Sequence, residues 1–492
     1  MGMESLKQMI KDVDKQMIRL FVLDHPENRK SMVPYEDQKG IEIYWGDLTR
    51  YEDVLSAMKG IDLVLHIAAF VSPAADYYPK KAMEVNFGSV RNMINAIYEL
   101  KAEHKVKVVY IGTVAQTGDR MPPIHWGRVG DPLKPSMFDY YAVSKIAAER
   151  MLIESGIKNW VSLRQTGIIG PGMSKIKDAI MFHNCFDNVL EYVSDRDSGR
   201  LIGNLCRFEQ SGELSSDFWG HIYNIGGGES CRVSTMQLFQ ELYGAIGLKK
   251  LEYVLEPKMQ ATRNFHGQYY LDSDKLENYL HFRQDSMQYY YDEYINGLGM
   301  AAGLSKVICK LPGGQKLMGS IMKRMFRKLA LTEHGTVNFI QNNVEDHIDA
   351  YWGSKKAWEA LPERLVDMEF FEDWDKIVLL DHGYDENKPE AELHLEDMRG
   401  AARFRGGKCI SKTMVTGDWR GKLKFICAFG HTFEASPRLV LEGGHWCPDC
   451  ERESWNYANR AERDPFFAQV WVPLHGTDEK RVYPKVVSEL DV

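Results

Sequence analysis

Residues 106–118, Val-Lys-Val-Val-Tyr-Ile-Gly-Thr-Val-Ala-Gln-Thr-Gly, decide the fold class of this chain. β-Branched and aromatic residues fill most of the first six positions and predict a strand, which ends at a threonine followed by small residues. Similar strand-like runs lie at 17–23, 63–67 and 160–163. Amphipathic segments such as 86–100 lie between them and predict helices. We therefore predict an α/β fold in which a doubly wound parallel sheet occupies residues 1–177.

A second stretch, Asp139-Tyr-Tyr-Ala-Val-Ser-Lys145, offers catalytic chemistry. In a helix, Tyr141 and Lys145 lie about one turn apart on the same face. A phenol is a poor acid-base group at neutral pH, but a neighbouring ammonium favours the phenolate and lowers the pKa of the tyrosine. Tyr141 is therefore a candidate proton donor and acceptor for a carbinol oxygen. The same spacing also arises by chance on helix surfaces, so the surrounding motifs decide whether Tyr141 and Lys145 are catalytic.

Further motifs flank this pair in a fixed order. They are Trp45-Gly-Asp-Leu-Thr49, His66-Ile-Ala-Ala69, Asn86-Phe-Gly-Ser-Val90, Val108-Val-Tyr-Ile-Gly-Thr113 and Leu163-Arg-Gln-Thr-Gly-Ile-Ile-Gly-Pro171. The ordered set closely resembles the extended short-chain dehydrogenase/reductase family, which includes nucleotide-sugar epimerases, dehydratases and 3β-hydroxysteroid dehydrogenases. The resemblance covers about residues 2–282.

The resemblance implies a Rossmann-type, dinucleotide-binding core and an enzyme that uses a nicotinamide cofactor. It implies a catalytic set of Thr113, Tyr141 and Lys145, in which Thr113 polarises the substrate oxygen and Lys145 also orients the ribose. The implied cofactor-binding residues are Gly2, Asp24, Asp47, Leu48, Ala68, Ala69, Lys145, Thr166 and Gly167. Homodimers that pair helices are usual in the family, so a homodimer is a further expectation.

The beginning of the sequence departs from the family pattern, which opens with a strand and a glycine-rich turn that holds the pyrophosphate. Residues 1–11 predict a helix instead, with Leu6, Met9 and Ile10 as its apolar face, and Gly2 as the last glycine of the motif. We therefore expect the first strand, which sits in the middle of the sheet, to be missing. We expect in-frame coding sequence upstream of Met1 to encode the missing strand and its glycines. The alternative is a natural variant that builds the pyrophosphate site in another way.

The choice of cofactor depends on Asp24, at the end of the strand that begins at Met17. An acid there accepts hydrogen bonds from the ribose diol and repels a 2′-phosphate, which favours NAD. Arg29 and Lys30 follow closely and could bind a 2′-phosphate, so NADP is the alternative cofactor.

Cysteines crowd the last part of the chain in a pattern typical of zinc sites. Cys427, His431, Cys447 and Cys450 form a C-x-x-x-H and a C-x-x-C. We predict structural zinc, because four protein ligands leave no open position for catalysis. A redox C-x-x-C is the alternative, and Cys409 is a fifth candidate or a substitute for His431. Residues 399–492 resemble zinc-ribbon or treble-clef modules.

Charge marks the border of this module. Residues 381–398 have the composition of an acidic linker, whereas residues 399–424 carry eight basic residues and one acid. Nucleic-acid binding is one interpretation of the basic edge. Docking of this edge on the acidic enzyme body or linker is the favoured one.

Composition limits the remaining alternatives. The chain has 492 residues, 44% of them hydrophobic, and a net charge of −8, which argues against a protein whose whole surface follows nucleic acid. We see no apolar run of about 18 residues and no signal-like N-terminus, so we expect no transmembrane segment and a cytoplasmic location. Residues 178–286 predict a substrate-facing lobe, and residues 287–380 a helical extension.

The helical extension contains a basic amphipathic helix near residues 317–329. Such a helix can lie on an anionic membrane. Packing on the enzyme body, with a solvated basic face, is the favoured interpretation.

Three functions remain. The first is an NAD(P)-dependent oxidoreductase that interconverts a secondary alcohol and a ketone, on a hydrophobic, sterol-like or lipid-like substrate because residues 121–138 are apolar and aromatic. A nucleotide-sugar epimerase or dehydratase is the second. The third, of another class, is a cofactor-sensing regulator with a zinc module that binds nucleic acid or protein.

Overall fold

The core of the protein is a four-stranded parallel sheet with helices on both faces. The computed structural model describes residues 1–12, 14–172, 177–452 and 454–487. The strand order is β10-β6-β4-β3. The strands are β3 (Leu63–His66), β4 (Lys107–Thr113), β6 (Asn159–Gln165) and β10 (His221–Ile225). The predicted α/β class is confirmed, and the strand predicted at the start of residues 106–118 is the central strand β4.

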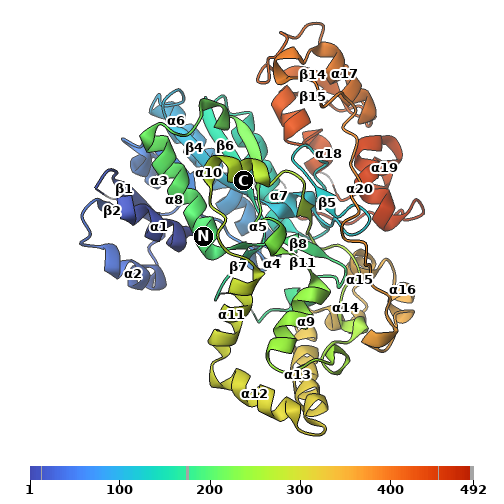
Figure 1. Ribbon diagram of the computed structural model, residues 1–492. Helices are drawn as coiled ribbons and strands as arrows, with labels where there is room; N and C mark the ends of the chain where they lie inside the picture. Colours follow the sequence, from blue (N-terminus) through green and yellow to red (C-terminus); the bar gives the residue numbers. More distant parts are fainter. Residues whose placement is uncertain (13, 173–176, 453, 488–492) are drawn as a thin grey trace.

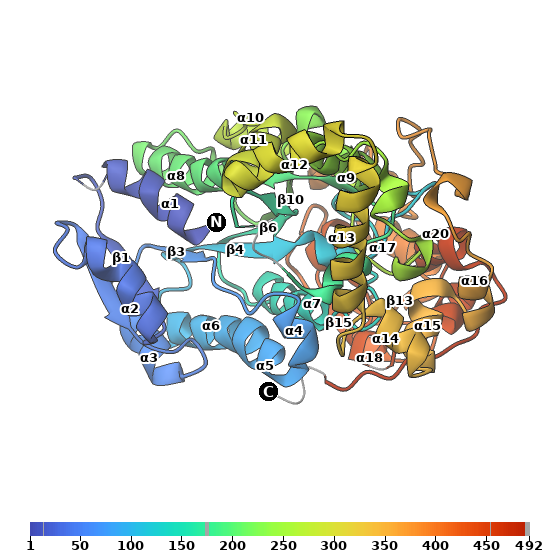
Figure 2. The same ribbon diagram turned by 90° about the horizontal axis from the view of Figure 1, so that it is seen from below.

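Alternate residues of β4 face two separate layers of helices. Val108 and Tyr110 pack with α3 (Tyr51–Met58), α6 (Ser89–Glu99) and α7 (Tyr140–Ile153). Val109 and Ile111 pack with α1 (Gly2–Met9) and α8 (Asp195–Ser211) on the opposite face. Figure 2 shows the sheet between these two layers. Because both faces of β4 are covered, its sequence is continuously apolar rather than alternating.

A second, two-stranded parallel sheet lies beside α2 (Pro26–Met32) and consists of β1 (Ile18–Val22) and β2 (Ile41–Trp45). Among the described residues, no strand joins β1 to β3. The break falls where the sequence predicts a missing central strand. Both strands are nevertheless partly covered, since Leu20 and Leu65 pack against the same apolar cluster.

Short elements surround the core, and a run of helices follows between Met287 and Glu359. The short elements around the core and in the lobe are α4 (Ala74–Tyr77), α5 (Pro79–Ala82), β5 (Trp126–Gly127), β7 (Ile168–Ile169), β8 (Val189–Glu191), β9 (Val193–Ser194), β11 (Arg232–Ser234), α9 (Thr235–Ala245), β12 (Tyr269–Tyr270) and α10 (Asp274–Leu280). The extension contains α11 (Met287–Leu298), α12 (Met300–Lys310), α13 (Gly314–Ala330), α14 (Thr336–Gln341), α15 (Glu345–Trp352) and α16 (Lys355–Glu359). None of the helices in the described ranges is both long and apolar enough to cross a membrane.

The C-terminal module, here residues 395–452 and 454–487, packs directly on the core (Figure 1). It contains α17 (Leu395–Phe404), an antiparallel sheet of β13 (Lys408–Cys409), β14 (Leu423–Ile426) and β15 (Thr432–Ala435), and then α18 (Pro448–Arg452), α19 (Tyr457–Arg463) and α20 (Pro465–His475). Its buried Leu423, Phe425 and Leu439 belong to the same apolar cluster as Val108 of the core. The module and the core therefore share one hydrophobic interior.

The stretch predicted as an acidic linker, residues 381–398, is not a free linker. His382 is buried, and its ring nitrogen Nε2 lies 2.9 Å from Oδ1 of Asp131 in the core. Leu393 is also buried, and α17 begins at Leu395, inside the predicted linker. The acidic composition suggested solvation, but apolar and histidine side chains between the acids anchor the segment to the protein.

Candidate active site and metal centre

The predicted active-site residues gather at one edge of the sheet. Thr113 ends β4, Ala68 and Ala69 follow β3, and Thr166 and Gly167 follow β6. Because the strands are parallel, their carboxyl ends meet at the same edge. The sheet thus brings together residues that lie up to 99 positions apart in the chain, from Ala68 to Gly167.

The start of α7 places Tyr141 against Thr113. Asp139 caps the helix, and its carboxylate accepts a hydrogen bond from the amide of Ala142 at 2.8 Å. The Tyr141 phenol lies near enough to Thr113 for the threonine side chain to favour the lower pKa of the phenol. Lys145 lies one turn further along, with its ammonium 4.1 Å from the centre of the Tyr110 ring. Tyr141 and Lys145 thus lie on the same helix, and Thr113 lies near Tyr141 at the end of β4.

Burial dominates the electrostatics of this site. It raises the pKa of Tyr141 above its ordinary value, even though the Thr113 side chain acts in the opposite direction. Burial also lowers the pKa of Lys145 to about 7, against an opposing effect of Glu149. The lowering of the Tyr141 pKa that the sequence predicts is therefore not found in this state. The phenol and the ammonium are both taken out of water, and each favours its neutral form.

A buried asparagine that the sequence did not assign a role holds the loop after β3 against α7. The Asn86 side chain accepts a hydrogen bond from the Phe70 amide at 2.7 Å and donates to the Phe70 carbonyl at 2.9 Å. It also donates to Ser144 Oγ at 2.9 Å, and Ser144 donates to the Tyr141 carbonyl at 2.7 Å. These bonds fix the backbone beside the catalytic tyrosine. The Asn86-Phe-Gly motif pointed to this place but not to these partners.

The predicted cofactor residues near β1 and β2 have partners within the protein. Both carboxylate oxygens of Asp24 accept hydrogen bonds from Arg29, at 2.5 and 2.7 Å, and both side chains are more than half exposed. The carboxylate of Asp47 accepts hydrogen bonds from the amide and the hydroxyl of Thr49, both at 2.8 Å. Leu48 packs against the core, and its carbonyl accepts a hydrogen bond from Asn92 at 3.0 Å.

Space rather than charge distinguishes the two predicted glycines. A Cβ at Gly167 would come within 2.8 Å of the Tyr192 ring, so only glycine fits there. A Cβ at Gly2 would meet no atom within 4 Å. The N-terminus of α1 is therefore open at Gly2, which leaves room for a ligand beside the first backbone amides of the helix.

A pocket of about 80 Å³ lies beside the N-terminal end of α7. Its polar lining includes Asp76, whose carboxylate accepts a hydrogen bond from the Tyr141 amide at 3.1 Å. Burial, together with the nearby Asp139 carboxylate, raises the pKa of Asp76 to about 8. Burial lowers the pKa values of His183 and His347 to about 4. Near neutral pH these three lining groups are largely uncharged and can donate or accept hydrogen bonds.

Part of the apolar loop that suggested a hydrophobic substrate is buried in the interior. Ile124 and Met137 are buried in a cluster with Trp455 and Trp471 of the C-terminal module. His125 is also buried, and its ring nitrogen Nε2 lies 2.8 Å from the Trp374 carbonyl oxygen. Most of these side chains fill the junction between segments, whereas Met137 and Phe138 at the end of the loop also line the pocket beside α7.

A buried carboxylate on α7 connects the active site to the C-terminal module. Glu149, one turn after Lys145, accepts hydrogen bonds from Ser162 at 2.6 Å, Arg164 at 2.7 Å and Gln116 at 2.9 Å. Its fourth partner is His445 of the module, with Nε2 3.1 Å away. Although burial opposes ionisation, Arg164 and His445 hold the pKa of Glu149 well below its usual range.

The same network reaches the catalytic threonine. Gln116 donates to Glu149 through its amide nitrogen, and its amide oxygen accepts a hydrogen bond from the Thr113 backbone at 3.0 Å. Arg164 also donates to the carbonyl of Gly443 in the module at 2.7 Å. No sequence motif marks Glu149 or His445, since the pairing exists only after distant segments meet.

Comparison with known proteins agrees with this geometry. The model of the NAD dependent epimerase/dehydratase family matches residues 7–196. These residues belong to that family. The resemblance inferred from the ordered motifs is thereby confirmed for the part of the chain that contains Thr113, Tyr141 and Lys145.

The curated relatives are of two kinds. A 3-beta-hydroxysteroid dehydrogenase from Mycolicibacterium neoaurum is 28% identical over 158 residues, which are 30% of this chain and 39% of the relative. A UDP-glucose 4-epimerase from Rickettsia bellii is 33% identical over 88 residues, 18% of this chain and 25% of the relative. The chain spans about two fifths of the length of the steroid dehydrogenases it matches.

Solved structures of the epimerase/dehydratase type also align. The dTDP-glucose 4,6-dehydratase DesIV from Streptomyces venezuelae, with NAD and TYD bound, is 19% identical, covers 62% of this chain and 95% of its own, and has a TM-score of 0.48.

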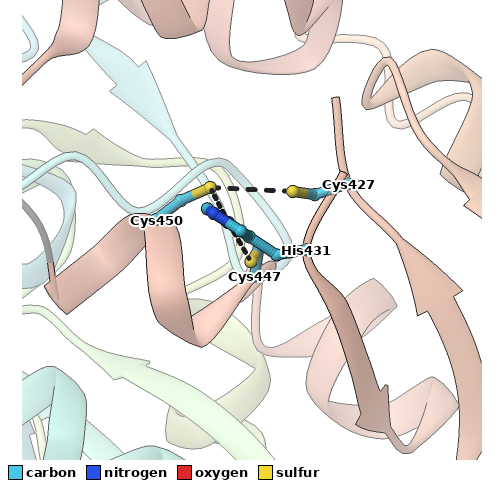
Figure 3. Close-up of side chains that lie close together, drawn as sticks. All are labelled: Cys427, His431, Cys447 and Cys450. Carbon is cyan, nitrogen blue, oxygen red and sulfur yellow. Dashed lines mark hydrogen bonds between the residues drawn. The ribbon is translucent and has the colours of Figure 1, made fainter. Parts of the chain in front are cut away.

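The four predicted metal ligands come together in the C-terminal module (Figure 3). Cys427 and His431 lie at the turn between β14 and β15, and Cys447 and Cys450 lie at the start of α18. The Sγ atoms of Cys427 and Cys450 are 3.8 Å apart, and His431 Nδ1 lies 3.6 and 3.4 Å from the sulfurs of Cys447 and Cys450. Tetrahedral zinc with Zn–S bonds of about 2.3 Å requires edges of roughly 3.8 Å. The site therefore has the size and the ligand set of a zinc site.

Part of the basic edge of the module is engaged in contacts with the protein itself, whereas Arg403, Lys408 and Lys412 are exposed. Arg420 donates to the Lys158 carbonyl of the core at 2.9 Å. Lys422 pairs with Glu154 of α7 at 3.4 Å. Arg405 is buried and lies 3.8 Å from the Phe466 ring centre. These contacts agree with docking on the enzyme body, the interpretation favoured over nucleic acid.

Proposed function

We propose that the protein is an NAD(P)-dependent oxidoreductase that interconverts a secondary alcohol and a ketone. The gathering of Thr113 at the end of β4 with Tyr141 and Lys145 on α7, at the carboxyl edge of the sheet, carries this proposal. Thr113 holds the substrate oxygen by a hydrogen bond, and Tyr141 donates a proton to that oxygen in reduction or accepts it in oxidation. A bound nicotinamide cofactor supplies or accepts the hydride.

The raised pKa of Tyr141 favours one protonation state at rest. The phenol is neutral near pH 7, so it is ready to donate a proton to a carbonyl oxygen. Oxidation requires the tyrosine to lose its proton first. Lys145 is the group placed to support that step, since it lies on the same face of α7.

We infer that several residues hold the cofactor. Asp24 would accept hydrogen bonds from the ribose diol, which favours NAD, and Arg29 beside it keeps NADP as the alternative. Asp47 and Leu48 would border the adenine. Ala68 and Ala69 would border the cofactor, and Thr166 and Gly167 would lie near the nicotinamide. The open N-terminus of α1 at Gly2 offers backbone amides to the pyrophosphate.

The substrate class has two candidates. The steroid dehydrogenase relatives support a sterol-like alcohol. The pocket beside α7 supports a second candidate, a polyhydroxylated substrate such as a nucleotide sugar, because its buried histidines and Asp76 offer uncharged hydrogen-bonding groups. A cofactor-sensing regulator remains the alternative from another class, and a homodimer stays a prediction.

Turnover of the full chain tests the proposed chemistry. We expect oxidation or reduction with NAD or NADP when hydroxysteroids, other lipid alcohols and nucleotide sugars are screened. Tyr141→Phe should lower kcat by roughly 10²- to 10⁴-fold, because it removes the proton donor. Tyr140→Phe is the matched control, since its hydroxyl accepts a hydrogen bond from the Val486 amide instead, and should stay near wild type. Unchanged turnover in Tyr141→Phe would contradict the proposal.

We also propose that Cys427, His431, Cys447 and Cys450 bind one structural zinc ion. Four ligands complete a tetrahedron, so no position remains for a substrate. Elemental analysis of the purified protein should find about one zinc per chain. Cys447→Ser should lose the metal, whereas Cys409→Ser, a buried cysteine of the same module outside the cluster, should retain it. Loss of zinc from both variants would place Cys409 among the ligands.

A further inference from the structure

A protruding pair of helices carries a concentration of exposed apolar side chains. We call residues 300–331, which contain α12 and α13, the arm. Of the 22 large hydrophobic residues that are exposed among the described residues, eight lie in the arm. They are Met300, Leu304, Val307, Leu311, Leu317, Ile321, Met325 and Leu331. Single exposed hydrophobics are normal on a protein surface, but a concentration of them indicates a binding surface.

The exposed residues follow helical spacing. On α12 and its C-cap they recur at 300, 304, 307 and 311, and on α13 at 317, 321 and 325. Intervals of three and four residues place them along one stripe of each helix. Each helix therefore presents an apolar stripe to solvent.

The opposite side of the arm is anchored to the protein. Met318, Met322 and Phe326 of α13 pack against the cluster around Tyr243 and Leu251. In α12, Ser305 is buried and donates to the Ile246 carbonyl at 2.8 Å. The sequence favoured packing of α13 with a solvated basic face. In the structure four of its seven large apolar residues pack, and Leu317, Ile321 and Met325 are exposed. The exposed stripes are thus a second apolar surface.

The charge of the arm is of one sign. It contains seven basic residues and no acidic one, although the whole chain has a net charge of −8. The basic residues are Lys306, Lys310, Lys316, Lys323, Arg324, Arg327 and Lys328. All except Lys323, which lies near Glu256, are classed as exposed. An occupant must therefore accept both apolar side chains and cations.

We propose that the arm binds an anionic lipid surface, with the apolar stripes in the headgroup and acyl boundary and the cations on lipid phosphates. A second copy of the chain is disfavoured, because it would bring two surfaces of the same charge together. Nucleic acid would pair with the cations but would leave the apolar stripes in water. Figure 1 shows α12 and α13 at the lower end of the molecule, away from the C-terminal module.

Vesicle co-sedimentation of the full chain tests this proposal. The wild type should bind phosphatidylcholine vesicles that contain about a third phosphatidylserine, and should bind pure phosphatidylcholine far less. Arg324→Gln with Arg327→Gln and Lys328→Gln should weaken binding by roughly 100-fold, since each cation near an anionic membrane contributes about a fivefold effect. The matched control removes three exposed charges of the module, in Arg403→Gln with Lys408→Gln and Lys412→Gln, and should bind as the wild type.

The apolar stripes need a separate variant. Leu317→Ser with Ile321→Ser and Met325→Ser should weaken binding at least tenfold in high salt, where the electrostatic attraction is screened. Circular dichroism and thermal unfolding should show that each variant remains folded. Equal binding of the control and arm charge variants would overturn the proposal, as would no effect of the serine variant. Dimerisation through the arm, without vesicle binding, would also overturn it.

Discussion

The C-terminal module and the arm are both attached to the same parallel-sheet core, but they use similar residues in opposite ways. Several basic and apolar side chains of the module contact the core: Arg420 and Lys422 contact its surface, and Phe425 enters its interior. The arm turns six exposed cations and two apolar stripes outward. Composition therefore does not tell which segment binds inward and which is free to bind a partner.

The module and the arm therefore also differ in how closely they are connected to the core. His445 of the module contacts Glu149, which shares Gln116 with the catalytic Thr113. The module also contributes Glu442, whose carboxylate accepts a hydrogen bond from the Ile222 amide of β10 at 2.9 Å. Changes in the module should consequently affect the stability of the core, whereas changes on the outer face of the arm should not.

The largest effect is expected at the buried link between module and core. Glu149→Gln leaves the buried Arg164 without its charge partner, so it should lower the free energy of unfolding by about 3–5 kcal/mol. Glu434→Gln is the matched control, because its pairing with Lys424 is exposed and contributes at most about 1 kcal/mol. Urea denaturation measures both. A Glu149 variant as stable as the control would mean that this network does not couple the two regions.

A smaller, pH-dependent effect is expected from Lys145. Its folded-state pKa of about 7 lies below the ordinary value of 10.5, because burial disfavours the ammonium. Between these two values the unfolded chain binds more protons than the folded protein, so the free energy of unfolding should rise with pH. The rise should be roughly 1 kcal/mol per pH unit.

Denaturation at pH 7.5 and 9.5 compares the wild type with Lys145→Met. The variant should lose this part of the rise, and Lys328→Met on the exposed face of the arm serves as its control. An identical pH dependence in wild type and Lys145→Met would show that the lysine is not held in a low-dielectric site.

The smallest effects are expected within α13, where neighbouring residues belong to the packed and the exposed sides. Phe326→Ala should lower the free energy of unfolding by about 1–2 kcal/mol, because the ring packs against Phe182 and Tyr243. Met325→Ala should change it by less than about 0.5 kcal/mol, because its side chain is 61% exposed. Thermal unfolding of the two variants is the measurement. Equal losses would mean that both sides of α13 are packed.

Much of the core and the candidate site was predictable from local sequence. The strand predicted at 17–23 is β1, and the helix predicted from Tyr141 and Lys145 is α7. The Cys and His spacing predicted a metal site whose four ligands meet. Each of these depends on residues close together in the chain or on an ordered motif. The buried loop at 121–138, the packed segment at 381–398 and the exposed stripes of the arm were not predictable, since their burial depends on distant partners.

The sequence by itself determined the alternation of strands and helices, the catalytic pair on one helix face and the cysteine spacing, because periodicity and spacing are local properties. Only the tertiary structure decided that the module shares the hydrophobic interior of the core and that Glu149 meets His445, 296 positions away. It also decided that burial raises the pKa of Tyr141 and lowers the pKa of Lys145, so that both side chains favour their neutral forms. Burial is the physical reason, because it depends on which distant segments exclude water from a residue.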